Sequence, residues 1–126
     1  MKQFIIIFWF TCIHLMAYSQ MVPESMVKAF ANGDSKKIAE YFHDNLEMKI
    51  LEDVHITSKN QATRILQVFF KDYPPTSFKV TYEGTKQDSK YGIGTLATKK
   101  GNFRVNLYFM EGRKEKIIYY LSIEKL

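Results

Sequence analysis

The strongest sequence signal for the fold lies in residues 78–124, FKVTYEGTKQDSKYGIGTLATKKGNFRVNLYFMEGRKEKIIYYLSIE. This stretch contains four runs of strand-forming residues that are separated by short turn segments. These runs cover 78–85, 91–98, 103–110 and 116–124. Because connections this short join antiparallel neighbours, the four runs are predicted to form a meander.

The alternation of apolar and polar residues within the runs predicts which face of the sheet is buried. Phe103, Val105 and Leu107 share one face of their run, whereas Arg104 and Asn106 lie on the other. The same alternation predicts that further apolar and aromatic residues face inward: Phe78, Val80, Tyr82, Ile117, Tyr119, Leu121 and Ile123. We expect helices to cover this side, which gives an α+β half-barrel with a curved, mostly antiparallel sheet.

Two groups of residues are candidates for binding. Aromatic and apolar residues that could line a pocket on the inner side are Tyr41, Tyr82, Tyr91, Tyr119, Phe103 and Leu107. Residues predicted to form an outer patch are Arg104, Asn106, Tyr108, Ile118 and Tyr120, with Leu96 as a further candidate. Such a patch fits a protein partner or a sheet-to-sheet homodimer, although cross-strand tyrosines that only stiffen the sheet would give the same pattern.

The segment upstream of the meander combines helices with a strand pair. Helical spacing over 26–31 ends at Asn32-Gly33, and Asp34 caps a second short helix whose apolar stripe runs to Phe42. A strand at 46–50 is predicted to turn into a short strand at 55–57. The longest helix begins after Ser58, which forms a capping box with Gln61, and ends at Pro74-Pro75.

Residues 1–19 have the plan of a secretory signal peptide. Lys2 precedes an apolar run over 4–16, and small residues at Ala17 and Ser19 fit a cleavage site after Ser19. The apolar run is shorter than the roughly 20 residues that cross a bilayer, so we expect removal and no stable membrane anchor. The alternatives are a lipoprotein linked through Cys12, whose preceding residues fit poorly, and a retained anchor helix.

The domain is predicted to span residues 22–126 after export to the periplasm or the medium. The formal net charge is +5, and the 46 % hydrophobic and 25 % charged residues can build one packed core. With one cysteine, Cys12, no internal disulfide or structural zinc site can form. Because the basic residues lie mostly in turns among acidic ones, we expect no nucleic-acid partner.

The predicted inner strand faces carry no carboxylate or histidine. Glu47, Glu83 and Glu124 alternate outward, so no residue is assigned a catalytic role. His43 and His55 lie near Asp44 and Asp53, but their spacing does not match a metal-binding motif. The sequence also lacks GxGxxG, GxxxxGK, GxSxG and HExxH motifs, and we expect no metal or other cofactor.

The order of elements resembles the nuclear transport factor 2-like superfamily, whose cone-shaped fold wraps a bent sheet around a helix. Segments 28–34, 38–42, 92–96 and 101–105 are similar to small secreted bacterial members known only as a domain of unknown function. These are packing and turn motifs, so they bear on fold more than on activity.

The resemblance leaves three functional hypotheses open. The first is an exported, non-catalytic domain that binds a small apolar ligand or a protein partner. The second is a pocket enzyme of the ketosteroid isomerase or dehydratase type, because superfamily enzymes place an acid or base in the cone. The third is a structural homodimer of the envelope.

Overall fold

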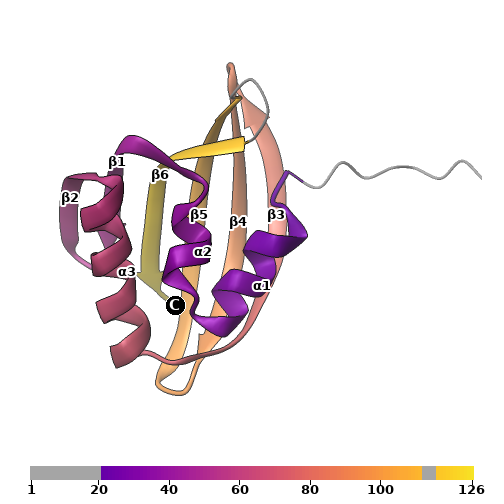
Figure 1. Cartoon of the computed structure of the whole chain (residues 1–126). Coiled ribbons are helices and arrows are strands. Elements are labelled where there is room, and N and C mark those ends of the chain that lie inside the picture. The colour runs from indigo at the N-terminus through magenta and orange to yellow at the C-terminus, as the bar shows by residue number, and fades with distance from the viewer. Residues whose placement is uncertain (1–20, 112–115) are drawn as a thin grey trace, which may run out of the picture.

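The computed structural model describes residues 21–111 and 116–126. Within them the chain forms three helices and six strands (Figure 1). The helices are α1 (Glu24–Asn32), α2 (Ser35–Ala39) and α3 (Lys59–Asp72). The strands are β1 (Phe42–Ile50), β2 (Asp53–Ser58), β3 (Pro75–Lys86), β4 (Ser89–Thr98), β5 (Gly101–Glu111) and β6 (Lys116–Lys125).

The six strands form one curved, open sheet in the order β2-β1-β6-β5-β4-β3. All neighbours are antiparallel except β1 and β6, which run parallel. The predicted meander is confirmed as β3 to β6, and the predicted α+β class with N-terminal helices on a curved sheet is confirmed as well. β2 and β3 form the two edges.

The local signals for the helices act as the sequence predicts. Gly33 ends α1 with φ at +65°, Asp34 accepts a hydrogen bond from Lys37 N at 3.1 Å, and Ser58 Oγ accepts one from Gln61 N at 3.3 Å. The predicted stripe of the second helix is too long, because Phe42 already belongs to β1. The backbone there turns to the sheet, where Tyr41 O accepts a hydrogen bond from Ile118 N at 2.7 Å.

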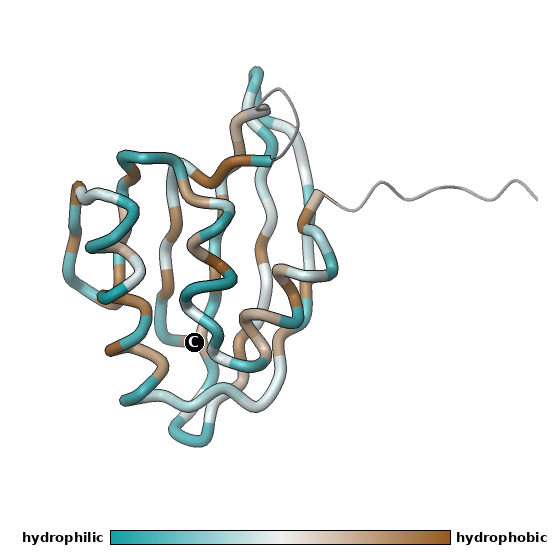
Figure 2. The backbone as a smooth tube through the Cα atoms, in the orientation of Figure 1, coloured by the Kyte–Doolittle hydropathy of each residue, from teal (hydrophilic) through white to brown (hydrophobic). Residues whose placement is uncertain are grey.

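All three helices cover the same face of the sheet (Figure 1). Figure 2 shows hydrophobic residues recurring along the helices and central strands, whereas the turns at the ends of the sheet are hydrophilic. In the core, the Phe30 ring stacks on Phe78 with centroids 4.7 Å apart and meets Phe70 edge-on at 6.3 Å. Gly94 makes room for this stack, because a Cβ there would lie 2.5 Å from the Phe78 ring.

A β-bulge in β3 reverses the predicted orientation of the residues that follow it. Val80 pairs with Gly94 and Tyr82 pairs with Ile93, so Thr81 is an extra residue in the ladder. Tyr82, predicted to face inward, is 57 % exposed on the outer face. Glu83, predicted to face outward, turns to the inner side.

A second bulge, in β6, corrects three more assignments. Ile117, predicted to face inward, is half-buried on the outer side. Tyr108 pairs with Tyr120 and Phe109 pairs with Ile118, which leaves Tyr119 as the extra residue. Ile118, a predicted interface residue, is therefore fully buried in the core. Tyr119, a predicted pocket residue, is half-buried on the outer side, where its ring lies near that of Tyr108.

Leu96 is also an inner residue. It is fully buried and pairs with Phe103, so it does not belong to the outer patch as predicted.

Because of the bulge in β6, alanine substitutions of two adjacent isoleucines should lower the free energy of unfolding by very different amounts. Ile118→Ala should lower the free energy of unfolding by about 2–5 kcal/mol, because it opens a cavity in the core. Ile117→Ala, the matched control at a half-buried outer position, should cost less than about 1 kcal/mol. Urea unfolding measures both values. A larger loss for Ile117→Ala would show that the bulge is misplaced.

Candidate functional site

The inner side of the sheet, where we predicted a ligand pocket, is filled by side chains. Phe103 and Leu107 are each only 1 % exposed. Phe69 and Tyr73 pack edge-on against the Phe103 ring, with centroid distances of 5.2 and 4.9 Å. These two pocket candidates are therefore part of the hydrophobic core.

The other pocket candidates are dispersed. Tyr41 lies in the link between α2 and β1, half-buried, and its hydroxyl is hydrogen bonded to Ser25 Oγ of α1. Tyr82, Tyr91 and Tyr119 lie on the outer face. The six candidates are thus divided between the core, the helical layer and the outer surface.

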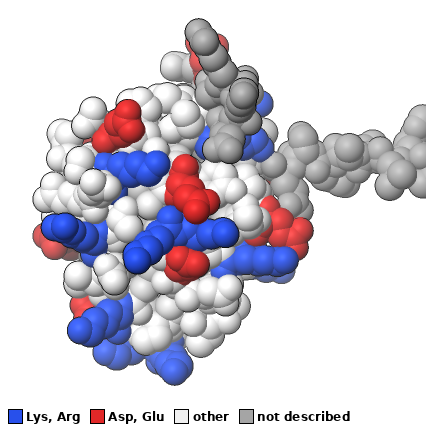
Figure 3. Space-filling view, in the orientation of Figure 1, with Lys and Arg blue, Asp and Glu red and all other residues white. Residues whose placement is uncertain are grey.

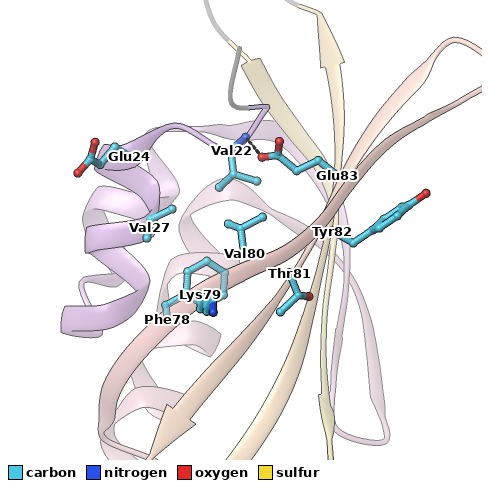
Figure 4. Close-up of a pocket in the computed structure, with 9 residues that line it drawn as sticks. All are labelled: Val22, Glu24, Val27, Phe78, Lys79, Val80, Thr81, Tyr82 and Glu83. Atoms are coloured by element: carbon cyan, nitrogen blue, oxygen red, sulfur yellow. Dashed lines mark hydrogen bonds between the residues drawn. The ribbon is translucent and has the colours of Figure 1, made fainter. Parts of the chain in front are cut away.

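One hollow of about 730 Å³ lies between α1 and the edge strand β3, and we call it the α1–β3 groove (Figure 4). Val22, Val27 and Val80 point into it, whereas Thr81 and Tyr82 point away. Its lining residues are Val22, Glu24, Val27, Phe78, Lys79, Val80, Thr81, Tyr82 and Glu83. The groove is apolar at its floor and carries charged groups at its rim.

Glu83 is the carboxylate that the sequence analysis misplaced. It is half-buried on the inner side, and its Oε1 accepts a hydrogen bond from Val22 N at 3.0 Å. This bond fastens the segment before α1 to β3. Since Thr81 and Tyr82 point away from the groove, their hydroxyls do not complement Glu83 there, and we assign Glu83 a structural role. The bulge at Thr81 has no marker in the sequence that would have revealed this position.

The outer face carries a continuous row of aromatic rings, which we call the outer tyrosine face: Tyr82, Tyr91, Tyr108, Tyr119 and Tyr120. The ring centroids of Tyr82 and Tyr91 lie 5.8 Å apart, and those of Tyr91 and Tyr108 lie 5.9 Å apart. Tyr108 then meets Tyr120 at 5.3 Å in a T-shaped arrangement. The row crosses four adjacent strands, β3 to β6.

Hydrogen bonds fix the orientation of several of these rings. Tyr119 donates its hydroxyl to Ser89 Oγ at 2.8 Å. A hydrogen bond with the Tyr82 side chain, followed by desolvation, raises the pKa of Tyr91 above its ordinary value. Gly84 leaves room for the Tyr91 hydroxyl, because a Cβ there would lie 2.6 Å from it. The outer tyrosine face is therefore an ordered surface.

A polar hollow of about 510 Å³ continues this face toward the other end of β5 and β6. Asn106 donates a hydrogen bond from Nδ2 to Ser122 Oγ at 2.8 Å. Arg104 and Glu124 stand directly opposite each other in the β5–β6 ladder. The structure thus brings together four of the five predicted interface residues: Arg104, Asn106, Tyr108 and Tyr120.

The charged side chains of the helical side are mixed in sign (Figure 3). His43 Nδ1 lies 2.8 Å from the Asn45 carbonyl oxygen, so this histidine interacts with its own strand. In the part of the chain that the structure describes, no three His, Cys, Asp or Glu side chains are grouped to hold a metal ion. None of the helices in residues 21–111 and 116–126 is long and apolar enough to span a membrane.

Comparison with known proteins identifies the family. The family model for the Domain of unknown function (DUF4783) matches residues 23–124. The chain belongs to the DUF4783 family. This family carries no named activity, and no curated protein matches the chain.

Solved structures of the DUF4783 family share this fold. The protein from Bacteroides ovatus ATCC 8483 is 31 % identical, with a TM-score of 0.78 over 85 % of this chain and 97 % of that chain. The protein from Bacteroides fragilis YCH46 is also 31 % identical, with a TM-score of 0.78 over 83 % of this chain and 99 % of that chain.

A more distant structure, Rd1NTF2_04 with long sheet, has a TM-score of 0.64 at 16 % identity and covers 79 % of this chain and 94 % of that chain. It shows likeness of fold alone.

Removing the Glu83 carboxylate should loosen the segment before α1. Glu83→Ala should lower the free energy of unfolding by about 1–2 kcal/mol, because Val22 N loses its acceptor. Glu83→Gln keeps an acceptor oxygen, so it should lower the free energy of unfolding by less than Glu83→Ala does. Glu24→Ala is the control: its exposed ion pair with Lys28, at 3.9 Å, should contribute less than about 0.5 kcal/mol. Equal losses for Glu83→Ala and Glu24→Ala in urea unfolding would contradict the anchoring role.

Proposed function

We propose that this DUF4783 protein is an exported, non-catalytic binding domain that pairs with a second copy of itself through the outer tyrosine face. The observation that carries the proposal is the row of five tyrosines across β3 to β6, on the side of the sheet that the helices leave uncovered. Tyrosine and arginine are enriched at protein interfaces, because one side chain supplies both contact area and a hydrogen bond.

The charges on this face favour a second copy over an unrelated partner. Arg104 and Glu124 lie opposite each other on adjacent strands, so the face carries both signs of charge. In a two-fold dimer the same patch meets itself, and a patch with both signs can place opposite charges across the interface. Tyr108 and Tyr120, which line the same polar hollow as this pair, would lie within the contact.

The filled interior supports a surface function over a pocket inside the cone. Phe103 and Leu107 occupy the volume in which a small apolar ligand would otherwise lie. The pocket-enzyme alternative has one observation in its favour, namely that Glu83 reaches the α1–β3 groove. Its carboxylate holds Val22 N, however, and the two neighbouring hydroxyls point away from it. The structural envelope homodimer would use the same outer face.

Export rests on the sequence of residues 1–19. A basic start, a short apolar run and small residues at Ala17 and Ser19 are the features that a signal peptidase requires. Cleavage after Ser19 would remove Cys12 and leave a chain without cysteine, which cannot form mispaired disulfides in an oxidising compartment.

The dimer predicts a specific response to charged substitutions on the outer face. Tyr108→Lys with Tyr120→Lys should weaken self-association by at least about tenfold in Kd, because both place ammonium groups inside the contact. Sedimentation equilibrium of the processed protein measures this. Val68→Lys, at an exposed position on α3, should leave the dimer intact. A wild-type protein that stays monomeric up to near-millimolar concentration would refute the proposal.

Export predicts a defined N-terminus. The protein recovered from the periplasm or medium of its source cells should begin at Gln20, or within a residue or two of it, when its N-terminus is sequenced. Ala17→Glu should block this processing, because the small position of the cleavage site is lost. Recovery of the wild-type chain with Met1 intact would contradict export by cleavage.

A further inference from the structure

A second hollow, of about 560 Å³, lies on the helical side, away from the outer tyrosine face; we call it the α3–β2 groove. Its floor is formed by apolar side chains of α3 and of the β1–β2 hairpin, among them Ile65, Phe69 and Leu51. Val68, also on its wall, is 60 % exposed. The volume lies within the range of small-molecule sites.

The groove has opposite charges at its two ends. Ser58 ends β2 and caps α3, so the chain reverses there and α3 runs back along β2. Arg64, in the first half of α3, therefore lies toward the same end as His55, whereas Asp72 lies toward the same end as Asp53. At about 1.5 Å of rise per residue, Arg64 and Asp72 are separated by about 12 Å along the helix.

These charged groups are available to a ligand. Within residues 21–111 and 116–126, none of Asp53, Arg64 and Asp72 takes part in an ion pair, and each is exposed. His55 is half-exposed beside them. A guanidinium binds a carboxylate in a planar two-point contact, and paired carboxylates suit an ammonium group.

The floor of the groove includes a residue with a left-handed backbone conformation. Leu51 has φ at +56°, a left-handed conformation that disfavours a residue with a branched side chain. Its N–H donates a hydrogen bond to Ile123 O at 2.8 Å, which holds this geometry. Leu51 lies in the two-residue turn between β1 and β2, and a positive φ is the usual geometry of such a hairpin turn.

We propose that the α3–β2 groove binds a short zwitterionic peptide with apolar side chains. The peptide carboxylate would meet Arg64 and His55, the peptide ammonium would meet Asp53 and Asp72, and the side chains would cover the apolar floor. An extended chain spans about 3.3–3.6 Å per residue, so a tripeptide matches the separation of the two ends and a single amino acid is too short. The proposal does not depend on the oligomeric state.

Calorimetric titration with trileucine, its N-acetyl form and its C-terminal amide tests the proposal on the processed protein. Trileucine should bind, and blocking either terminus should weaken binding by at least about tenfold in Kd. Triglycine, which has no apolar side chains, should bind much more weakly. Amide resonances of residues 61–73 should shift on titration with trileucine.

Two variants test which end of the α3–β2 groove binds the carboxylate of the peptide and which end binds its ammonium group. Arg64→Gln should remove the preference for a free carboxylate over the amide and keep the preference for a free ammonium group, whereas Asp72→Asn should do the reverse. Lys86→Gln, at an exposed position on β3 at the opposite edge of the sheet, is the control and should change neither preference. No trileucine binding up to millimolar concentration, or equal binding of the N-acetyl form to the wild-type protein, would overturn the proposal.

Discussion

Burial of one face of the curved sheet determines how the helices, the hollows and the exposed aromatic residues are arranged. The three helices cover that face, and large side chains such as Phe30, Phe103 and Leu107 fill the space between the layers. Burying these side chains supplies most of the driving force for folding, and it leaves the interior without room for a ligand. The uncovered face is then free to carry tyrosines, and the α1–β3 and α3–β2 grooves lie at the two margins of the helical layer.

The sequence predicts the regular parts of this fold because each carries a local physical signal. Alternation in β5 correctly assigns Phe103 to the core and Arg104 to the surface, and the Ser58 cap correctly begins α3. The two bulges carry no such signal, since Thr81 and Tyr119 are ordinary strand residues. Each bulge shifts the alternation by one residue, so the orientations predicted after Thr81 in β3 and before Tyr119 in β6 are reversed.

How far each candidate site could be predicted also depends on whether a bulge interrupts the alternation of its strand. Arg104 and Tyr108 share a strand without a bulge between them, so their outer position could be derived. Glu83 follows a bulge and was assigned to the wrong face. The α3–β2 groove joins residues from three elements, and only the packing of α3 on the hairpin brings Arg64 and His55 to one end. In a family with no named activity, these surfaces are where functional experiments should begin.

The filled interior can be tested directly with xenon, which enters apolar cavities that are otherwise empty. Methyl resonances of the wild-type protein are followed by 13C NMR under xenon pressure, with Leu107→Ala as the positive control. A filled interior should give no saturable shift at the Val105, Leu107 and Ile123 methyl groups of the wild type, and a saturable shift around the new cavity in the variant. A saturable shift of those wild-type methyl groups would instead show that the cone is open and that the interior is not filled.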